Sequence, residues 1–342
     1  MKPGSDADDP AIWIHPTDPS KSLMFLSDKS GAIFVYDFSG KQLQAIRFGS
    51  SLNNIDVRTA FRFGNETIDI VAANLRAAGK LAVLRINPNH SGSNALTVLA
   101  DDKSANNAIS PTSYGFTLYR RPSDGAMFVF DKTKGSQPIV QWRLSGDNGQ
   151  ISVTKVRDFK DVAIGQAEGF VADDELGFVY FAEETKGVHK YNANPDSGQN
   201  NRLAFFASGD GTANDREGLA LYKCNDGSGY LVLSSQGNST FKVYERQSNA
   251  FVKTFIAKES EGTDGLDVSS SSAPGFPNGF AVIHDDNQMQ YYVYDWADIA
   301  QSDLRVCPNG GAGGTPTPLP TTPPPTTPPP TTPPPRRPPA WP

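Results

Sequence analysis

The sequence predicts an all-β protein, a six-bladed β-propeller with mostly four-stranded antiparallel blades around a central channel. A short motif recurs six times, with an acid or another polar residue at the entrance of an apolar strand. The Pro, Asn or Gly in each copy falls at positions 10, 54, 115, 169, 218 and 265, so the copies are 44 to 61 residues apart. A repeat of roughly 40–50 residues that holds several short strands is typical of a propeller blade.

The motif itself reads as a turn that leads into a strand. In the first copy, Asp6-Ala-Asp-Asp-Pro-Ala-Ile-Trp13, the proline fixes φ and the residues after it suit a pleated surface. The other copies are Asn53-Asn-Ile-Asp-Val57, Tyr114-Gly-Phe-Thr-Leu118, Glu168-Gly-Phe-Val-Ala-Asp173, Glu217-Gly-Leu-Ala-Leu221 and Asp264-Gly-Leu-Asp-Val268.

Short apolar stretches separated by turn residues predict the strands of each blade in order. Blade one is expected at 11–14, 23–27, 33–37 and 43–47, and blade two at 55–58, 67–73, 81–86 and 97–100. Blade three is expected at 116–119, 126–130, 139–144 and 153–159, and blade four at 170–172, 178–182, 188–191 and 203–206. Blade five is expected at 219–222, 230–234, 241–244 and 252–256, and blade six at 266–268, 279–283 and 290–294.

Blade six has no evident fourth strand. Either residues 303–306 complete it, or a strand on the N-terminal side has been cut away, since only residues 1–5 precede the first motif. An unpaired edge would be a liability. Residues 296–300 are expected to form one helical turn, the only helix that the sequence suggests.

Composition divides the chain into a propeller domain, 1–307, and a Gly-rich and then Pro/Thr-rich tail, 308–342, expected to be a disordered linker. The net charge of −6 argues against a nucleic-acid partner, and the lack of a long apolar run argues against a membrane span. We expect a monomer. No signal peptide precedes Asp6, but a Pro/Thr spacer favours a secreted protein. Cys224 and Cys307 permit one disulfide or two unpaired thiols.

Carboxylates at the strand entrances are the main candidates for chemistry. If these strands line the channel, their entrances converge, and that many acids need counter-charge. Calcium, which binds six to eight oxygen ligands, is the natural neutraliser. A single acid-Gly pair is most simply a tight turn with a solvated charge, but recurrence in register favours a metal. The candidate ligands are Asp8, Asp9, Asp56, Glu168, Asp215, Glu217 and Asp264, with Asp285 at a later strand end.

Blade four adds the adjacent acids Glu183 and Glu184 at the end of an apolar strand. Neighbours on a strand point to opposite faces, so either one of them is a ligand and the other faces outward, or the pair simply belongs to a polar loop. The pair Asp285-Asp286 presents the same two alternatives. Basic residues that follow the second strands suggest a rim that attracts phosphate: Lys29, Arg76, Lys132 and Lys134. Tyr114, which replaces the acid in blade three, either donates a hydrogen bond to such an anion or packs.

These motifs, in order over about residues 6–300, resemble the β-propeller phytases, a family of alkaline, calcium-dependent 3-phytases. The first two copies and the blocks at 114–119, 168–175, 180–184 and 229–239 carry the resemblance. It implies a phosphoric monoester hydrolase that releases phosphate and lower inositol phosphates from phytate, myo-inositol hexakisphosphate, or its calcium salt. Several calcium ions, structural and catalytic, are implied, with direct attack by a calcium-bound water.

The resemblance also implies roles for individual residues. The implied catalytic acids are Glu168, Glu184, Asp215, Glu217 and Asp264, and the implied phosphate-binding residues are Lys29, Arg76, Tyr114 and Lys132. The chain departs from the family in three ways. Asp28 replaces the first of two lysines, no acid follows Lys132, and the N-terminal lead-in is short.

Two other functions fit a propeller. A lactonase would need one central cation and no phosphate-binding bases, and a binding propeller would use calcium only for stability. Because the predicted ligands are carboxylates, metal and stability are expected to be lost as the pH falls, which favours a neutral-to-alkaline working range.

Overall fold

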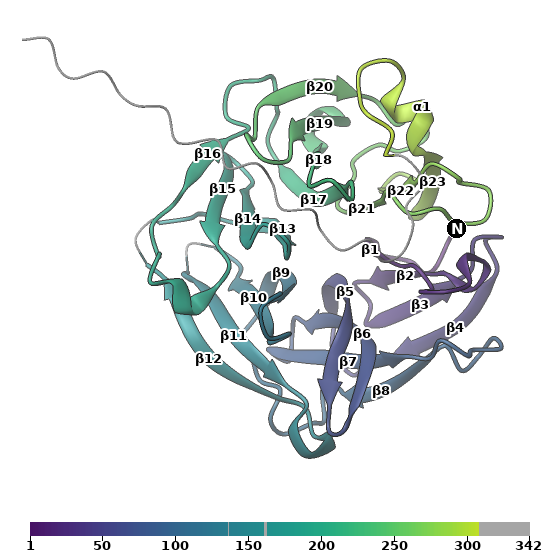
Figure 1. Cartoon of the computed structure of the whole chain (residues 1–342), viewed down its shortest axis with the longest axis vertical. Coiled ribbons are helices and arrows are strands. Elements are labelled where there is room, and N and C mark those ends of the chain that lie inside the picture. Colours follow the sequence, from purple (N-terminus) through teal and green to yellow (C-terminus); the bar gives the residue numbers. More distant parts are fainter. Residues whose placement is uncertain (136, 161–162, 308–342) are drawn as a thin grey trace, which may run out of the picture.

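Six antiparallel sheets are arranged around a central axis in the computed structural model, as Figure 1 shows. The structure describes residues 1–135, 137–160 and 163–307. Five sheets have four strands and one has three, so the predicted six-bladed propeller is confirmed. The predicted tail at 308–342 lies outside the described residues.

Each blade runs outward from the channel in chain order. Blade one is β1 (Ala7–Trp13), β2 (Leu23–Asp28), β3 (Ala32–Tyr36) and β4 (Gln42–Arg47), and blade two is β5 (Leu52–Phe63), β6 (Glu66–Leu75), β7 (Lys80–Ile86) and β8 (Leu96–Ala100). Blade three is β9 (Ser113–Arg120), β10 (Met127–Thr133), β11 (Ile139–Ser145) and β12 (Ser152–Phe159), and blade four is β13 (Ala167–Asp173), β14 (Phe178–Glu183), β15 (Gly187–Asn192) and β16 (Ala204–Phe206). Blade five is β17 (Arg216–Lys223), β18 (Gly229–Ser235), β19 (Thr240–Glu245) and β20 (Phe251–Phe255), and blade six is β21 (Leu266–Ser269), β22 (Phe280–Asp285) and β23 (Gln290–Asp295).

The hydrophobic core is divided among the blade interfaces. Each of its six clusters takes residues from two neighbouring blades, and together they cover every interface around the ring. Trp13 and Phe25 of blade one pack with Val71 of blade two, for example, and Phe34 packs with Phe280 of blade six. Because each face of a blade buries apolar side chains against its neighbour, packing closes the ring.

Blade six shows how the chain ends are joined. Residues 303–306 form no strand, so the prediction that they complete the blade is wrong. The backbone of Met1 instead exchanges two hydrogen bonds with Tyr291 on β23, each 2.8 Å long. The predicted helical turn is confirmed as α1 (Trp296–Ala300). Four short 3₁₀ turns were not predicted: η1 (Pro19–Lys21), η2 (Asp147–Gly149), η3 (Pro195–Ser197) and η4 (Gln236–Asn238).

The question left open for the two cysteines is answered by a disulfide. Cys224 and Cys307 are bonded, with their Cα atoms 5.3 Å apart and a sequence separation of 83. The Trp296 ring also stacks on Tyr222 at a centroid distance of 3.8 Å. The segment after blade six is therefore fixed to blade five.

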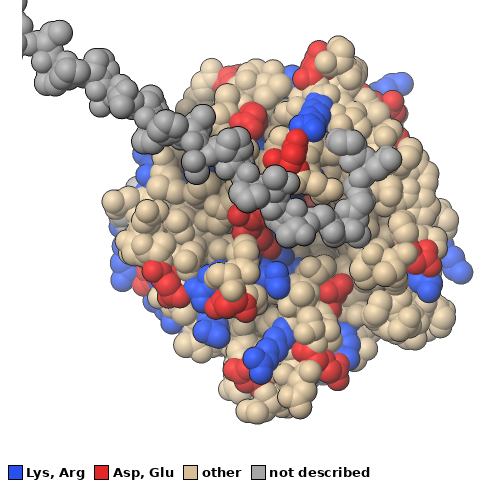
Figure 2. Space-filling view, in the orientation of Figure 1, with Lys and Arg blue, Asp and Glu red and all other residues tan. Residues whose placement is uncertain are grey.

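The surface carries no single-sign patch on the face seen in Figure 2, where acidic and basic side chains are interspersed. In the described part of the chain, no helix has the length and apolar character needed to cross a membrane.

Candidate active site

In blades one to five, a β-bulge at the start of the innermost strand aims the motif side chain. In blades one, two, four and five, two residues on the inner strand face one residue on its partner, and in blade three Tyr114 is the extra residue. A bulge bends the strand and turns a side chain out of the regular alternation. The bulged pairs are Asp8-Asp9, Asn53-Asn54, Glu168-Gly169 and Glu217-Gly218.

The glycines in the motif allow neighbouring inner strands to approach closely. A Cβ on Gly169 would lie 1.6 Å from the backbone oxygen of Glu217, and a Cβ on Gly265 would lie 2.1 Å from the Asp9 carboxylate. A side chain at these positions would push the blades apart. The glycine of each pair is therefore required by the packing of neighbouring blades. The acid beside it faces the mouth of the channel, where the inner strands converge.

Three buried glutamates meet at this mouth. Carboxylate oxygens of Glu168, Glu184 and Glu217, from blades four and five, lie within 4.8 Å of one another. Gln166 donates hydrogen bonds to Glu184 Oε2 at 2.8 Å and to the Tyr114 hydroxyl at 3.3 Å. Within the described residues, Glu184 Oε1 and Glu217 Oε2 are buried without a hydrogen-bond partner.

The adjacent acids of blade four have different surroundings, and neither faces outward. Glu184 joins the cluster, whereas the buried Glu183 pairs with His189 at 2.9 Å and Lys186 at 2.7 Å. Glu183 also accepts a hydrogen bond from the Gly165 N–H at 2.8 Å, which fixes the loop that carries Gln166.

Cations border the acids. The Lys29 ammonium lies 2.9 Å from Asp8 Oδ1 and 2.8 Å from Asp264 Oδ2, so it links blades one and six. The Arg76 guanidinium and the Lys134 ammonium lie over the Tyr114 ring, 5.0 and 4.9 Å from its centroid. The structure thus brings Lys29, Arg76 and Tyr114 to the same mouth as the acids.

Lys132 is placed differently. Its side chain is fully buried, and its ammonium donates to the backbone oxygens of Gly135, at 2.5 Å, and Gln137. Burial lowers the pKa of Lys132 to about 8, partly offset by Glu183. Binding of phosphate by Lys132 stays a prediction, and it requires the ammonium to leave these two carbonyls. Lys134, two residues later, is exposed beside Tyr114.

Burial and mutual repulsion perturb the acids. The pKa of Glu217 is raised well above its usual value by burial and then by the charges of Glu168 and Glu184. Burial also raises the pKa of Asp8 although Lys29 opposes it, and burial raises the pKa of Glu184. Burial alone would lower the pKa of Lys29, but the carboxylates of Asp8 and Asp264 outweigh it and raise that pKa. The site therefore lacks positive charge.

The blade-six side of the mouth holds a second group. Ligand atoms of Asp264, His284 and Asp286 lie within 4.8 Å of one another. Asp285, the predicted ligand, is buried, and its Oδ1 accepts from the Glu261 N–H at 3.2 Å. Sequence reasoning singled out the acid pair Asp285-Asp286 and named Asp285 as the ligand, but it did not select His284, which neighbours them.

Asp215 lies beside the glutamates, half-buried just before β17, and its charge contributes to the raised pKa of Glu184.

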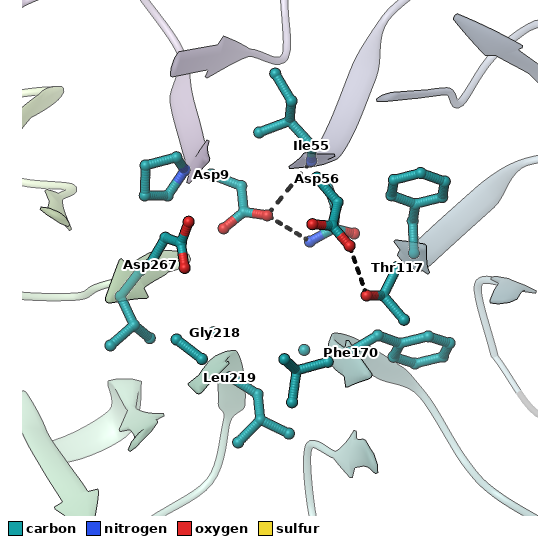
Figure 3. Close-up of a pocket in the computed structure, with 15 residues that line it drawn as sticks. Asp9, Ile55, Asp56, Thr117, Phe170, Gly218, Leu219 and Asp267 are labelled. Carbon is teal, nitrogen blue, oxygen red and sulfur yellow. Dashed lines mark hydrogen bonds between the residues drawn. The ribbon is translucent and has the colours of Figure 1, made fainter. Parts of the chain in front are cut away.

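The side chains of Asp9 and Asp56 lie in the channel, with Asp267 near them (Figure 3). Asp9 Oδ2 accepts from the Ile55 N–H at 3.4 Å, and Asp56 Oδ2 accepts from the Thr117 hydroxyl at 2.7 Å.

Channel burial has a large effect on these acids. It raises the pKa of Asp267 to about 7, with a further contribution from Asp56. It also raises the pKa of Asp9 well above its usual value, with a contribution from Asp8. The acidic lining thus continues from the mouth into the channel.

Comparison with known proteins identifies the family. The sequence profile described as phytase matches residues 1–301. The chain belongs to the phytase family. It is 38% identical over 317 aligned residues to the 3-phytase of Bacillus subtilis (strain 168), an alignment that covers 87% of this chain and 81% of the relative. These matches confirm the resemblance noted in the sequence and establish the chain as a phytase.

Solved structures resemble the fold at low identity. A β-propeller domain from Myceliophteria thermophila is 10% identical, with a TM-score of 0.49 and coverage of 84% of this chain and 83% of that one. The structure of BBS1N in complex with ARL6DN is 11% identical, with a TM-score of 0.49 and coverage of 86% and 78%.

Proposed function

We propose that this phytase releases phosphate and lower inositol phosphates from myo-inositol hexakisphosphate by direct attack of water, and that the reaction depends on calcium. The observation that carries the proposal is the cluster of Glu168, Glu184 and Glu217. Its carboxylates are buried together next to cationic side chains from other blades. Such a site gains both charge balance and substrate affinity when it binds a cation and an anion together.

Calcium suits the donor atoms present. The glutamate cluster offers only oxygen ligands, and two of its buried oxygens have no partner among the described residues. When bound, calcium supplies positive charge that lowers the pKa of water and neutralises phosphate oxygens. The proposed ligands of several ions, structural and catalytic, are Asp8, Asp9, Asp56, Glu168, Glu184, Asp215, Glu217, Asp264 and Asp285.

The chain's own cations and its tyrosine bind the substrate in this proposal. Lys29 supplies a point charge between Asp8 and Asp264, and Arg76 presents a planar guanidinium that suits phosphate oxygens. Burial, followed by the charges of Glu168 and Glu217, raises the pKa of Tyr114, so its hydroxyl stays protonated and able to donate. Lys134, whose ammonium lies over the same ring, is assigned to the phosphate, and Lys132 joins it only if its ammonium leaves the two carbonyls that hold it.

The carboxylates position water and accept its proton. Glu217 is the proposed acceptor of this proton, because it belongs to the cluster and its buried Oε2 has no hydrogen-bond partner among the described residues. The other proposed catalytic acids are Glu168, Glu184, Asp215 and Asp264. Since water is the attacking group, the chain forms no covalent phosphoenzyme.

We also propose that the protein is a secreted monomer. The disulfide is compatible with an oxidising compartment, where such bonds persist. Residues 1–307 would be the catalytic domain and 308–342 a spacer. The net acidity argues against nucleic acid as a partner.

Phosphate release from phytate, measured with calcium and with EDTA, tests the proposal. We expect release that requires calcium and is lost in Glu217→Gln. Glu66→Gln is the matched control, because Glu66 is exposed and paired with Arg85 away from the mouth. Release that persists in EDTA would remove calcium from the reaction. No release, with calcium still raising the melting temperature, would indicate a binding propeller, and lactone hydrolysis without phosphate release a lactonase.

A further inference from the structure

Asn53 occupies the position in blade two that an acid occupies in other blades. It is the first bulged residue of β5, as Asp8 is in β1, Glu168 in β13 and Glu217 in β17. Its side chain is fully buried. A neutral amide therefore faces the mouth from blade two, whereas blades one, four and five present carboxylates at the same position.

The two ends of this amide contact opposite kinds of group. The Asn53 NH₂ donates to Glu168 Oε1 at 2.5 Å and to the Tyr114 backbone oxygen at 3.0 Å. The Asn53 carbonyl accepts from the Arg76 guanidinium at 3.1 Å. The partners fix this orientation, because a carboxylate and a carbonyl only accept and a guanidinium only donates.

We propose that Asn53 is a positioning residue that couples phosphate binding by Arg76 to the orientation of the catalytic carboxylate of Glu168. The inference rests on the proposed function. An aspartate at this place would lose the donor and repel Glu168, and a lysine or arginine would lose the acceptor. An amide is the side chain of this size that satisfies both neighbours.

The geometry also shows why Arg76 needs such a partner. The Arg76 guanidinium lies over the Tyr114 ring. This contact restrains the distance of the guanidinium from the ring, but it leaves the guanidinium free to rotate within its own plane. The hydrogen bond to Asn53 supplies that second restraint. Substrate held by Arg76 is thereby placed at a fixed distance from Glu168, which depends on the same amide.

A purely structural role predicts different behaviour, and Asn74 provides the comparison. Asn74 is also fully buried, faces the same bulge from β6, and donates to the same Tyr114 backbone oxygen at 3.0 Å. Its other hydrogen bond goes to the Ser113 hydroxyl at 3.1 Å. Asn53→Leu and Asn74→Leu therefore remove matched buried amides, only one of which contacts Arg76 and Glu168.

The experiment measures kcat and KM for phytate at saturating calcium, together with melting temperature. We expect Asn53→Leu to raise KM about fivefold or more and to lower kcat about tenfold or more, since hydrogen bonds to charged groups are the strong ones. Asn74→Leu should lower the melting temperature by a similar amount and keep both constants within about twofold.

A double-mutant cycle with Arg76→Ala separates the two contacts. In the Arg76→Ala background, Asn53→Leu should no longer raise KM but should still lower kcat through Glu168. If Asn53→Leu does not fold, Asn53→Ser, whose hydroxyl both donates and accepts, serves as a milder replacement.

Calorimetric binding of inorganic phosphate gives a readout independent of turnover. We expect Asn53→Leu to weaken it and Asn74→Leu to leave it unchanged. Additive effects on KM, or equal effects of the two asparagine variants, would overturn the proposal. If the unaltered protein released no phosphate, the proposed function would fail, and phosphate calorimetry would still decide whether Asn53 supports Arg76.

Discussion

Removing one charge from the glutamate cluster should stabilise the metal-free protein while abolishing activity. Glu217 is buried, and its carboxylate lies within 4.8 Å of those of Glu168 and Glu184. Two unit charges at that distance repel by about 3.5 kcal/mol at an effective dielectric constant of about 20. Protonation of one carboxyl group relieves part of this repulsion. We therefore expect Glu217→Gln to raise the free energy of unfolding by about 1–3 kcal/mol and the melting temperature by roughly 3–6 °C.

The assay is thermal melting of both proteins in EDTA and in calcium at pH 8. In EDTA the variant should melt higher. Addition of calcium should raise the melting temperature of the unaltered protein more than that of the variant, because only the unaltered protein offers the Glu217 carboxylate to the ion. Glu66→Gln, which removes an exposed glutamate, should change neither melting temperature by more than a degree or so. A variant that melts at or below the unaltered protein in EDTA would refute the repulsion argument.

The sign of the pH dependence follows from the same group. The folded-state pKa of Glu217 is raised above 4.5, so the folded protein holds a proton that the unfolded chain has already released. The stability of the metal-free protein should therefore fall as the pH rises from about 4.5 through the raised pKa. Glu217→Gln should flatten this slope. With calcium present the trend should reverse at low pH, because protons displace the ion.

Three further changes test other parts of the structure. Reduction of the Cys224–Cys307 disulfide breaks no contact at the mouth. It should therefore lower the free energy of unfolding by about 2–5 kcal/mol, measured by chemical denaturation, and leave calcium-dependent turnover at 25 °C intact. Gly169→Ala places a Cβ 1.6 Å from a facing backbone oxygen, so calcium-dependent melting and phosphate release should be lost together. Lys134→Ala should raise KM with little change in melting temperature, whereas Lys132→Ala should mainly lower the melting temperature; the opposite pattern would show that Lys132 is the residue at the phosphate.

Much of the fold is encoded in local patterns. The repeat near 50 residues predicted six blades, and the alternation of strand side chains offered divergence of Glu183 and Glu184 as one of two alternatives. The recurring acids predicted the mouth, since equivalent positions in a closed ring must converge. These patterns hold for each blade by itself, which is why one sequence suffices to read them.

The sequence did not specify contacts between blades. It left the cysteine pairing open, assigned phosphate binding to Lys132 rather than to Lys134, and offered residues 303–306 for a strand that they do not form. The cysteine pairing depends on segments that meet only in the folded ring. The placement of Lys132 is decided within its own blade, by backbone oxygens only three and five residues later.

Asn53 is the clearest case. By sequence it is a polar substitute for an acid in the second repeat, with nothing nearby to indicate a partner. Besides its neighbour Asn54, its side chain contacts Arg76, Tyr114 and Glu168, which lie 23, 61 and 115 residues away along the chain. The sequence alone therefore determined the blades and their acidic entrances. Closure of the ring decided which side chain holds which, because bulge geometry and blade packing set those distances.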